Sequence, residues 1–340
     1  MQTASTPLFA CVTENTPEWF EKARNLLLSM REFGGAWKDS PVVVSFVGSV
    51  EPKFERALTR LGAEVQVVAP YGARYRFSNK MRMFDLFDES RDFDVLVALD
   101  CDVLVMGDLS PLVPADAVGV VPAGRDLMNL DQWETVYQMF DLTPPEHDCV
   151  MRISGRRTYP YYNTGVVSIP RAMGAELESA WTDILGNFGP VHERFARVHH
   201  QRVHHENQIA FALAILMKHL PLRELTASLN YSTAAPLDRR FRDELKPPFI
   251  VHYHQAIDGQ GFIKGSPSKR VDRVIDEFNR FRARELGLTY EQLAGVPLMT
   301  RVQKSAQTRS WYKTNTVRRL RRSVLGKAVK RVSAAGARRT

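Results

Sequence analysis

The chain has 340 residues, 44% of them hydrophobic, 25% charged and 10% aromatic, a composition that excludes disordered, collagen-like and coiled-coil proteins. Its three cysteines are not closely paired, which excludes a disulfide framework and a Cys-x-x-Cys zinc site and favours a reducing, intracellular setting. The net charge of +8 is unevenly distributed. Residues 301–340 carry thirteen Lys and Arg and no acid, which leaves 33 basic and 38 acidic residues in 1–300. We therefore expect a slightly acidic body with a basic tail.

Membrane-spanning and secretory segments are not expected from the pattern of apolar residues. The longest apolar run, 209–217, has nine residues, whereas a bilayer span needs about 20. The first fifteen residues lack a basic start followed by an apolar stretch, so we expect no secretory signal.

Short apolar runs alternate with segments of helical period from the N-terminus onwards. We expect strands at 8–12, 42–47 and 63–68, with helices at 17–33 and 52–61 between them. This βαβαβ order predicts an α/β fold with a mostly parallel sheet.

The rest of the body continues in the same way. The predicted helices are 79–87, 130–140, 172–185, 206–219 and 269–286. The predicted strands are 94–99, 117–121, 165–169 and 249–253. The segments 144–160 and 186–201 are expected to be loops.

The sharpest motif is Asp100-Cys101-Asp102, which separates two apolar runs. Two carboxylates at the carboxyl edge of a parallel sheet lie where α/β proteins bind ligands. Because neighbouring negative charges repel unless a cation lies between them, the motif favours a divalent metal that is also held by nucleotide phosphates. The alternative is a pair of aspartates that cap a turn.

Two further patterns place polar groups at the starts of predicted elements. Asn163 and Gly165 lie at the entrance of a strand, and Glu206, Asn207 and Gln208 open an apolar helix. These groups could face a site. The alternatives are ordinary strand punctuation and a Glu206 that complements the helix dipole.

A pair of histidines occurs near the end of the body. His252 and His254 lie on one face of the predicted strand 249–253, because side chains alternate along a strand. A Gly-rich loop and Lys264 follow. The pair is a candidate ligand set, and the alternative is a structural role.

Taken in order, these motifs resemble the GT-A glycosyltransferases. The likeness is to family 8, the family of glycogenin and the bacterial lipopolysaccharide galactosyltransferases, and it extends over about residues 8–264. It implies a Rossmann-like, mostly parallel central sheet flanked by helices. It also implies transfer of a sugar from a nucleoside-diphosphate sugar, such as a UDP-sugar, to a glycan or lipid-linked acceptor, with retention of anomeric configuration.

In that family the donor diphosphate is held on a metal ion. The resemblance assigns Mn²⁺ (or Mg²⁺) to Asp100, Asp102 and His252, with His254 as the alternative histidine. An imidazole ligand favours Mn²⁺ over Mg²⁺, since nitrogen suits the softer ion. The metal would act as a Lewis acid on the leaving diphosphate.

The resemblance also implies contacts with the donor and roles in catalysis. The residues implied for the donor are Thr13, Arg76, Lys80, Arg82, Asp100, Cys101, Asp102, Asn163, Gly165, His254 and Lys264. The catalytic candidates are Gln208, Asn207, Glu206 and Asp131. Among these, Lys80 matches the basic residue that precedes the Asp-x-Asp motif in the family, Thr13 would lie by the base and ribose, and Asn163 and Gln208 would face the sugar.

The chain departs from the family pattern in three places. Asn207-Gln208 stands after Glu206 where the family usually has Asp-Gln, and Lys264 lies twelve residues after His252 instead of a few. The turn after His252 also differs. Some GT-A enzymes invert configuration with a carboxylate base. Asp131, Asp258 and Glu206 are therefore open as candidate bases.

The basic tail has the pattern of an interfacial helix. Trp311 and Tyr312 precede apolar residues at helical spacing, and Arg and Lys surround them. The apolar residues are Val317, Leu320, Val324, Leu325, Val329 and Val332. We expect peripheral attachment to an anionic membrane, at the cytoplasmic inner face. The alternatives are a solvated tail and, less favoured because no recognised module is present, nucleic-acid binding.

These observations predict a GT-A domain over 1–300 and a membrane-associating tail over 301–340. The nucleotide-binding half would span 1–121 and the acceptor half 122–300. Two other functions stay open on the sequence. A haloacid-dehalogenase-type phosphatase also uses Asp-x-Asp after a strand, and a non-catalytic membrane-surface protein would bind vesicles alone.

Overall fold

The structure is a computed structural model that describes residues 5–72, 76–200, 203, 205–247, 249–254, 257–266 and 268–288. The body of the chain forms one compact unit, Met1–Leu286. The predicted basic tail lies outside the described residues, and the domain boundary at residue 300 stays a prediction. None of the described helices combines the length and the apolar character that a bilayer crossing requires.

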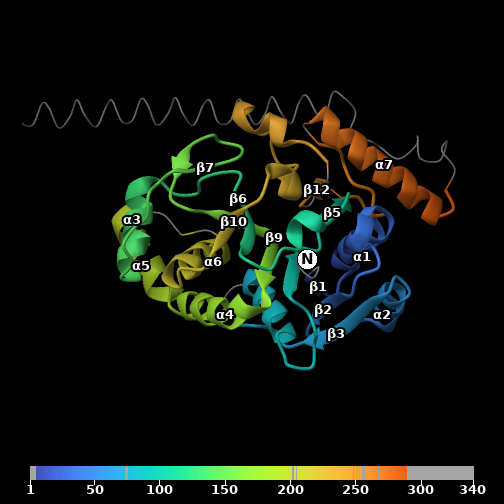
Figure 1. Cartoon of the computed structure of the whole chain (residues 1–340), viewed down its shortest axis with the longest axis horizontal. Helices are drawn as coiled ribbons and strands as arrows, with labels where there is room; N and C mark the ends of the chain where they lie inside the picture. The colour runs from blue at the N-terminus through green and yellow to red at the C-terminus, as the bar shows by residue number, and fades with distance from the viewer. Residues whose placement is uncertain are drawn as a thin grey trace, which may run out of the picture. The chain divides into compact units, whose positions relative to one another are not determined.

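A seven-stranded sheet forms the centre of the unit (Figure 1). Its order is β10 (Leu222–Glu224), β6 (Val118–Pro122), β9 (Tyr162–Pro170), β4 (Val95–Leu99), β1 (Pro7–Glu14), β2 (Val42–Val47) and β3 (Ala63–Val68). Strand β9 runs antiparallel to β4 and β6, and every other pairing in this sheet is parallel. The mostly parallel sheet predicted from the sequence is confirmed.

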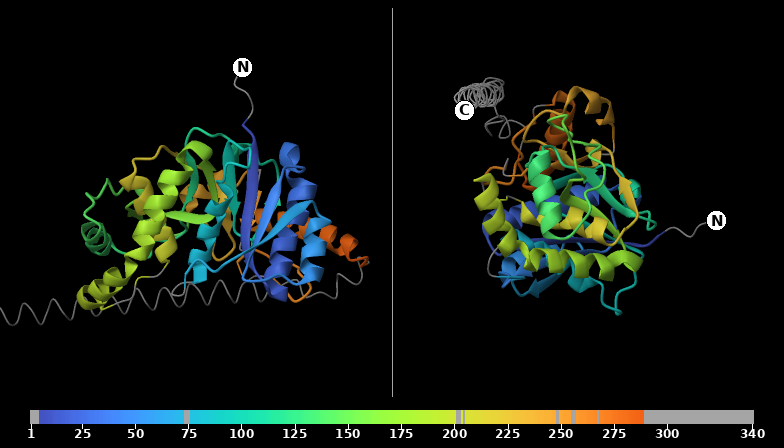
Figure 2. Two further views of the ribbon diagram at one scale, coloured as in Figure 1. Left: turned by 90° about the horizontal axis from the view of Figure 1, so that it is seen from below. Right: turned by 90° about the vertical axis from the view of Figure 1, so that its left-hand side faces the viewer.

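Helices cover both faces of this sheet (Figures 1 and 2). One face packs on α1 (Pro17–Phe33) and α2 (Pro52–Thr59), and the other packs on α4 (Arg171–Gly186) and α6 (Glu206–Met217). In β4 all five residues are buried, and they alternate between the two hydrophobic clusters. Successive side chains of a strand point to opposite faces of the sheet. Because both faces are covered here, the strand is apolar at every position.

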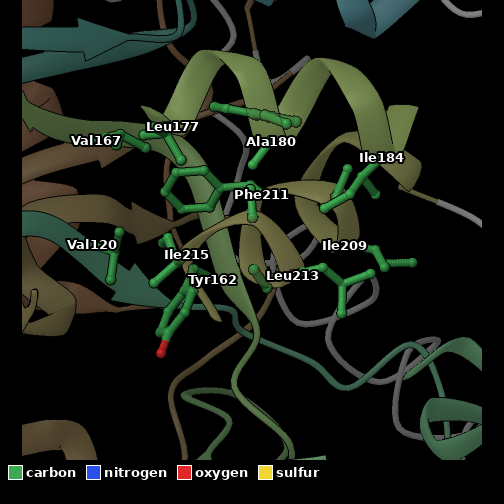
Figure 3. Packing of buried hydrophobic residues seen from close by; sticks show 14 of the residues in the cluster. Val120, Tyr162, Val167, Leu177, Ala180, Ile184, Ile209, Phe211, Leu213 and Ile215 are labelled. Carbon is green, nitrogen blue, oxygen red and sulfur yellow. The ribbon is translucent and has the colours of Figure 1, made fainter. Parts of the chain in front are cut away.

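The hydrophobic cluster under α4 and α6 contains a close aromatic contact between these two helices. Phe211 of α6 lies against Leu177 and Ala180 of α4 and faces Val167 of β9 (Figure 3). Its ring centroid is 4.7 Å from that of Trp181. This packing holds α6 against β9. The start of α6 lies near the start of that strand, because the Tyr161 hydroxyl donates to Gln208.

After β4 ends, the chain enters a smaller sheet. It contains β11 (Tyr231–Ser232), β12 (Phe249–His252) and β5 (Val103–Met106), in that order. Strand β12 runs antiparallel to β5 and pairs His252 with Val103. The sheet therefore brings a histidine from late in the chain next to the end of the Asp-x-Asp motif.

Helix α1 contacts this small sheet, the turn that follows β12 and helix α7 (Lys269–Glu285) through polar side chains. The Ser29 hydroxyl accepts a hydrogen bond from the Val105 N–H over 3.0 Å, and the Asn25 amide donates to the Gly261 carbonyl over 2.8 Å. Glu21 forms an ion pair with Arg282 of α7. Helix α1 thereby supports the sheet that carries His252.

The remaining elements surround these sheets. They are α3 (Leu130–Met139), α5 (Phe188–His199), β7 (Cys149–Val150) and β8 (Arg157–Thr158), with 3₁₀ helices η1 (Gly35–Trp37), η2 (Arg76–Leu86), η3 (Ser110–Leu112), η4 (Ala227–Asn230) and η5 (Arg239–Glu244).

The expected loop at 186–201 is wrong, because most of it forms α5. Phe188, Val191 and Phe195 are buried at helical spacing, and Pro190 lies in the first turn, where its missing N–H costs nothing. The expected loop at 144–160 contains the short hairpin β7–β8. The predicted helix at 79–87 is the 3₁₀ helix η2.

Gly174 gives a test of the packing of α4. A methyl group at this position would overlap the ring of Phe87, whereas one at Gly186, at the end of the same helix, would meet nothing within 4 Å. We expect Gly174→Ala to lower the free energy of unfolding by about 1–3 kcal/mol through overpacking. Gly186→Ala should leave it unchanged or raise it by up to about 1 kcal/mol. Urea denaturation measures both variants, and equal stabilisation by the two would contradict the packing.

Candidate functional site

The Asp-x-Asp motif lies where the chain passes from the large sheet to the small one. The Asp100 N–H donates to the Gly165 carbonyl over 2.8 Å, and the Asp102 carbonyl accepts from the Tyr253 N–H over 3.1 Å. The backbone of each aspartate is thus fixed by a different sheet. Cys101 between them is buried in the hydrophobic cluster, and burial raises the pKa of its thiol well above the usual range. Its side chain therefore belongs to the core.

His252 faces both carboxylates. Its Nε2 lies 3.1 Å from Asp102 Oδ1 and 3.8 Å from Asp100 Oδ2. Burial by itself lowers the pKa of His252, but the negative charge and hydrogen bond of Asp102 outweigh it and raise the pKa above the usual value. Burial likewise opposes the charge of Asp102, yet His252 holds the pKa of that carboxyl below its usual value. The two form a buried ion pair.

A chain of hydrogen bonds establishes that Nδ1 of His252 is protonated. The backbone N–H of Gly165 donates to Asn163 Oδ1 over 2.7 Å, and the amide nitrogen of Asn230 donates to the same oxygen over 3.1 Å. The remaining amide oxygen of Asn230 lies 3.1 Å from His252 Nδ1. Because a backbone N–H can only donate, each orientation in the chain follows from it, and His252 Nδ1 must be the donor. The Nε2 atom is left for the carboxylates or for a metal.

Gly165 makes room for this histidine. A Cβ at position 165 would lie 2.6 Å from His252 Cε1 and 2.7 Å from Nδ1. The glycine that the sequence places in the Asn-x-Gly motif is therefore required by contact with the imidazole. Asn230, by contrast, was not predicted, because it lies in a short segment without a recognisable motif.

Lys80 supplies the positive charge on the other side of the motif. Its Nζ lies 2.5 Å from Asp100 Oδ1 and also donates to the Thr164 carbonyl, and its side chain is 11% exposed. The two oxygens of Asp100 thus have different neighbours, Lys80 on one and His252 on the other.

His254 lies beside His252, with 4.0 Å between the ring centroids. Its Nε2 is 2.8 Å from the Ser232 hydroxyl. Burial, helped by the nearby His252, lowers the pKa of His254 to about 3, so this ring is neutral. One ligand atom from each of Asp102, His252 and His254 lies within 4.8 Å of the others.

The start of α6 contributes the predicted polar residues around β9. Gln208 Oε1 accepts a hydrogen bond from the Tyr161 hydroxyl over 2.7 Å, just before Asn163 in the chain. Asn207 is buried, and its Oδ1 has no hydrogen-bond partner among the described residues. Glu206 is bound by His192 over 2.6 Å.

Two other predicted donor contacts lie around the first strands. Thr13 is buried near the end of β1, and its hydroxyl donates to the Trp19 carbonyl over 3.3 Å. Arg82 donates to the carbonyls of Ala69 and Pro70. Arg76 begins η2, and the orientation of its side chain is outside the described part of the structure.

The remaining predicted residues are not brought to the carboxylates by any contact in the described part of the chain. Asp131 is exposed in the first turn of α3, which lies at the left of Figure 1, away from β12. Asp258 accepts the N–H groups of Gln260 and Phe262 and closes a turn. Lys264 is exposed after that turn.

The donors at the sheet edge fit a divalent cation. Asp100 and Asp102 offer carboxylate oxygens, and His252 offers Nε2, the nitrogen that does not donate to Asn230. A metal ligand imidazole usually donates its other N–H to a protein oxygen in this way. An imidazole beside carboxylates suits a transition-metal ion better than it suits Mg²⁺.

Three comparisons with known proteins bear on this site. No curated protein matches the chain. The solved structure of the bifunctional glycosyltransferase WbbM has a TM-score of 0.52 at 14% identity and covers 88% of this chain and 52% of its own. The galactosyltransferase LgtC in complex with donor and acceptor sugar analogs gives 0.46 at 14% identity, over 84% of this chain and 99% of its own. Mouse xyloside xylosyltransferase 1 gives 0.42 at 14% identity, over 73% and 97%.

The likeness to WbbM supports the fold, which is the GT-A type of mostly parallel sheet flanked by helices. The sequence comparison goes further. The model of the Rhodobacterales glycosyltransferase domain matches residues 1–218, well over half of the chain. The chain therefore belongs to the Rhodobacterales glycosyltransferase domain family and is a glycosyltransferase.

Proposed function

We propose that this glycosyltransferase is metal-dependent and moves a sugar from a nucleoside-diphosphate sugar, most simply a UDP-sugar, to a glycan or lipid-linked acceptor, in the manner of family 8. The observation that supports this most strongly is the convergence of Asp100, Asp102 and His252 at the edge of the sheet, with Lys80 beside them. A site with this donor set binds a cation and an anionic donor together.

In the proposal Asp100, Asp102 and His252 hold Mn²⁺ (or Mg²⁺). The bound ion supplies Lewis-acid stabilisation of the diphosphate as the bond between sugar and phosphate breaks. His252 would donate its Nδ1–H to Asn230 Oδ1 and offer Nε2 to the cation. The Asp102–His252 ion pair balances charge in the free protein, and His252 would release its Nε2 proton to solvent where a cation takes the place of this ion pair.

Other side chains then orient the donor. Lys80, whose ammonium lies at Asp100, is placed to donate to the diphosphate. Thr13, at the end of β1, lies at the strand edge where nucleotides bind in α/β folds. Asn163 and Gln208, from β9 and the adjoining start of α6, would orient the sugar ring.

Retention of configuration is the stereochemical outcome that we propose. Inversion needs a carboxylate that is placed to take the acceptor's proton. Glu206 is bound to His192, Asp258 closes a turn, and Asp131 lies on α3. None of these three is joined to the carboxylate cluster by a contact among the described residues.

The acceptor would be met at the cytoplasmic face of a membrane. The thirteen basic residues of 301–340 would attract an anionic surface, at about 1 kcal/mol for each cation near it. Peripheral attachment of this kind suits a lipid-linked or envelope glycan acceptor.

Metal-dependent donor binding is tested by thermal shift with a panel of nucleotide sugars, with and without Mn²⁺. We expect one nucleotide to raise the melting temperature only with Mn²⁺, since a ligand at 100 times its Kd adds about 2.7 kcal/mol. Asp102→Asn should abolish the shift. Asp116→Asn, at an exposed aspartate paired with Arg223, is the matched control and should retain it. Equal stabilisation with and without Mn²⁺ would contradict the metal dependence.

The stereochemical proposal has a direct readout. ¹H NMR of the early product, before mutarotation or with a blocked acceptor, should show the anomeric configuration of the donor. We expect Glu206→Gln to retain measurable transfer, because Glu206 is bound to His192 and is not the base. A product of opposite configuration, together with loss of all transfer in Glu206→Gln, would establish an inverting reaction.

Membrane attachment is tested by flotation with vesicles of anionic or neutral lipid. The full chain should float with anionic vesicles at low salt and be released at high salt, because surface charges are screened. A chain that ends at residue 300 should stay in solution but keep its nucleotide-dependent thermal shift. Unchanged flotation of the shortened chain would contradict the role of the tail.

A further inference from the structure

His254, two residues after the end of β12, has no role in the proposed mechanism, although its side chain lies close to Asp102 and His252. A ligand atom of His254 lies within 4.8 Å of ligand atoms of Asp102 and His252. The two imidazoles lie 4.0 Å apart between centroids, with an angle of 33° between their planes. A single ion could therefore be reached by both rings and by the carboxylate.

The backbone at His254 is turned so that this is possible. His254 has a φ of 55°, in the left-handed region that few residues other than Gly, Asn, Asp and His adopt. Strand β12 ends at His252, and the left-handed turn keeps the second ring beside the first. A backbone conformation of this kind is maintained where the surrounding contacts require it.

One short segment holds both rings. Asn230 bonds to His252 Nδ1, and Ser232, two residues later, bonds to His254 Nε2. The pairing of β11 with β12 places Ser232 opposite His252. The same segment thus orients both imidazoles, each through one nitrogen, as protein groups orient the histidines of metal sites.

We propose that His254 is a metal ligand together with Asp100, Asp102 and His252, held in place by Ser232, and that this second imidazole makes the site select Mn²⁺ over Mg²⁺. The inference rests on the proposed metal-dependent function and specifies its ion. Mg²⁺ prefers oxygen ligands and releases water reluctantly, whereas imidazole suits the transition ions. With two nitrogens the protein would discriminate strongly between them.

His254→Asn is the informative variant, because Asn tolerates the left-handed backbone but is a poorer ligand for a transition ion than imidazole. The matched control is His219→Asn, at an exposed histidine with a φ of 49° at the end of α6. Melting temperatures of both variants establish that they fold. Ser232→Ala tests the positioning of the ring, and Asp102→Asn is the reference for loss of the site.

Two measurements on the untagged full chain with UDP read out the ligand set without catalysis. Isothermal titration with MnCl₂ and MgCl₂ should show that His254→Asn weakens Mn²⁺ binding about tenfold or more and Mg²⁺ binding by less than about twofold. Ser232→Ala should show a smaller loss of the same kind. Pulsed EPR should detect nitrogen coupling from two imidazoles on Mn²⁺ in the wild type and from one in His254→Asn.

The outcomes separate this inference from the function on which it rests. An unchanged Mn²⁺ affinity and an unchanged nitrogen count in His254→Asn, with loss of binding in Asp102→Asn, would overturn the role of His254 and leave the metal-dependent function standing. Failure of the wild type to bind either ion with UDP would overturn both. An effect of His219→Asn as large as that of His254→Asn would also overturn it, since the loss would then be unspecific.

Discussion

The transfer of the chain from one sheet to another at Asp100–Asp102 is the constraint on which the site depends. Strand β4 is buried on both faces and cannot carry a carboxylate until it ends. Strand β5 then joins the small sheet and pairs with β12, which places His252 beside Val103 and so beside Asp102. Had β5 continued in the large sheet, these charges would have no imidazole partner.

The small sheet and the turn that follows it are held against α1 by buried hydrogen bonds. Ser29 and Asn25 of α1 satisfy backbone groups at Val105 and Gly261 from inside the protein. A buried polar group without a partner costs free energy, so the Ser29 bond favours one position of β5 against the helix, and the Asn25 bond does the same for the turn after β12. The position of His252 is thus determined through a helix formed near the start of the chain.

The fold could be predicted from the sequence where its periodicity was strong. The run Val95–Leu99 is apolar throughout because both its faces are buried, and the βαβαβ order at the start of the chain predicts a parallel sheet. The helix at Phe188–His199 was missed because Gly189 and Pro190 resemble a loop signal, although both lie in its first turn. The strands β10 and β11 are too short for any period to show.

Asp100, Asp102 and His252 were named from the sequence because a motif and a strand pattern marked them, and the structure brings them together. Asn230 was not, because its importance arises from a pairing between β11 and β12 that no local pattern encodes. The contact at Gly165 links this position to His252. The space that its missing side chain leaves is filled by the imidazole of His252, so the two positions are not free to vary independently. A larger residue at position 165 would overlap the imidazole, so this chain could accept one only if His252 moved.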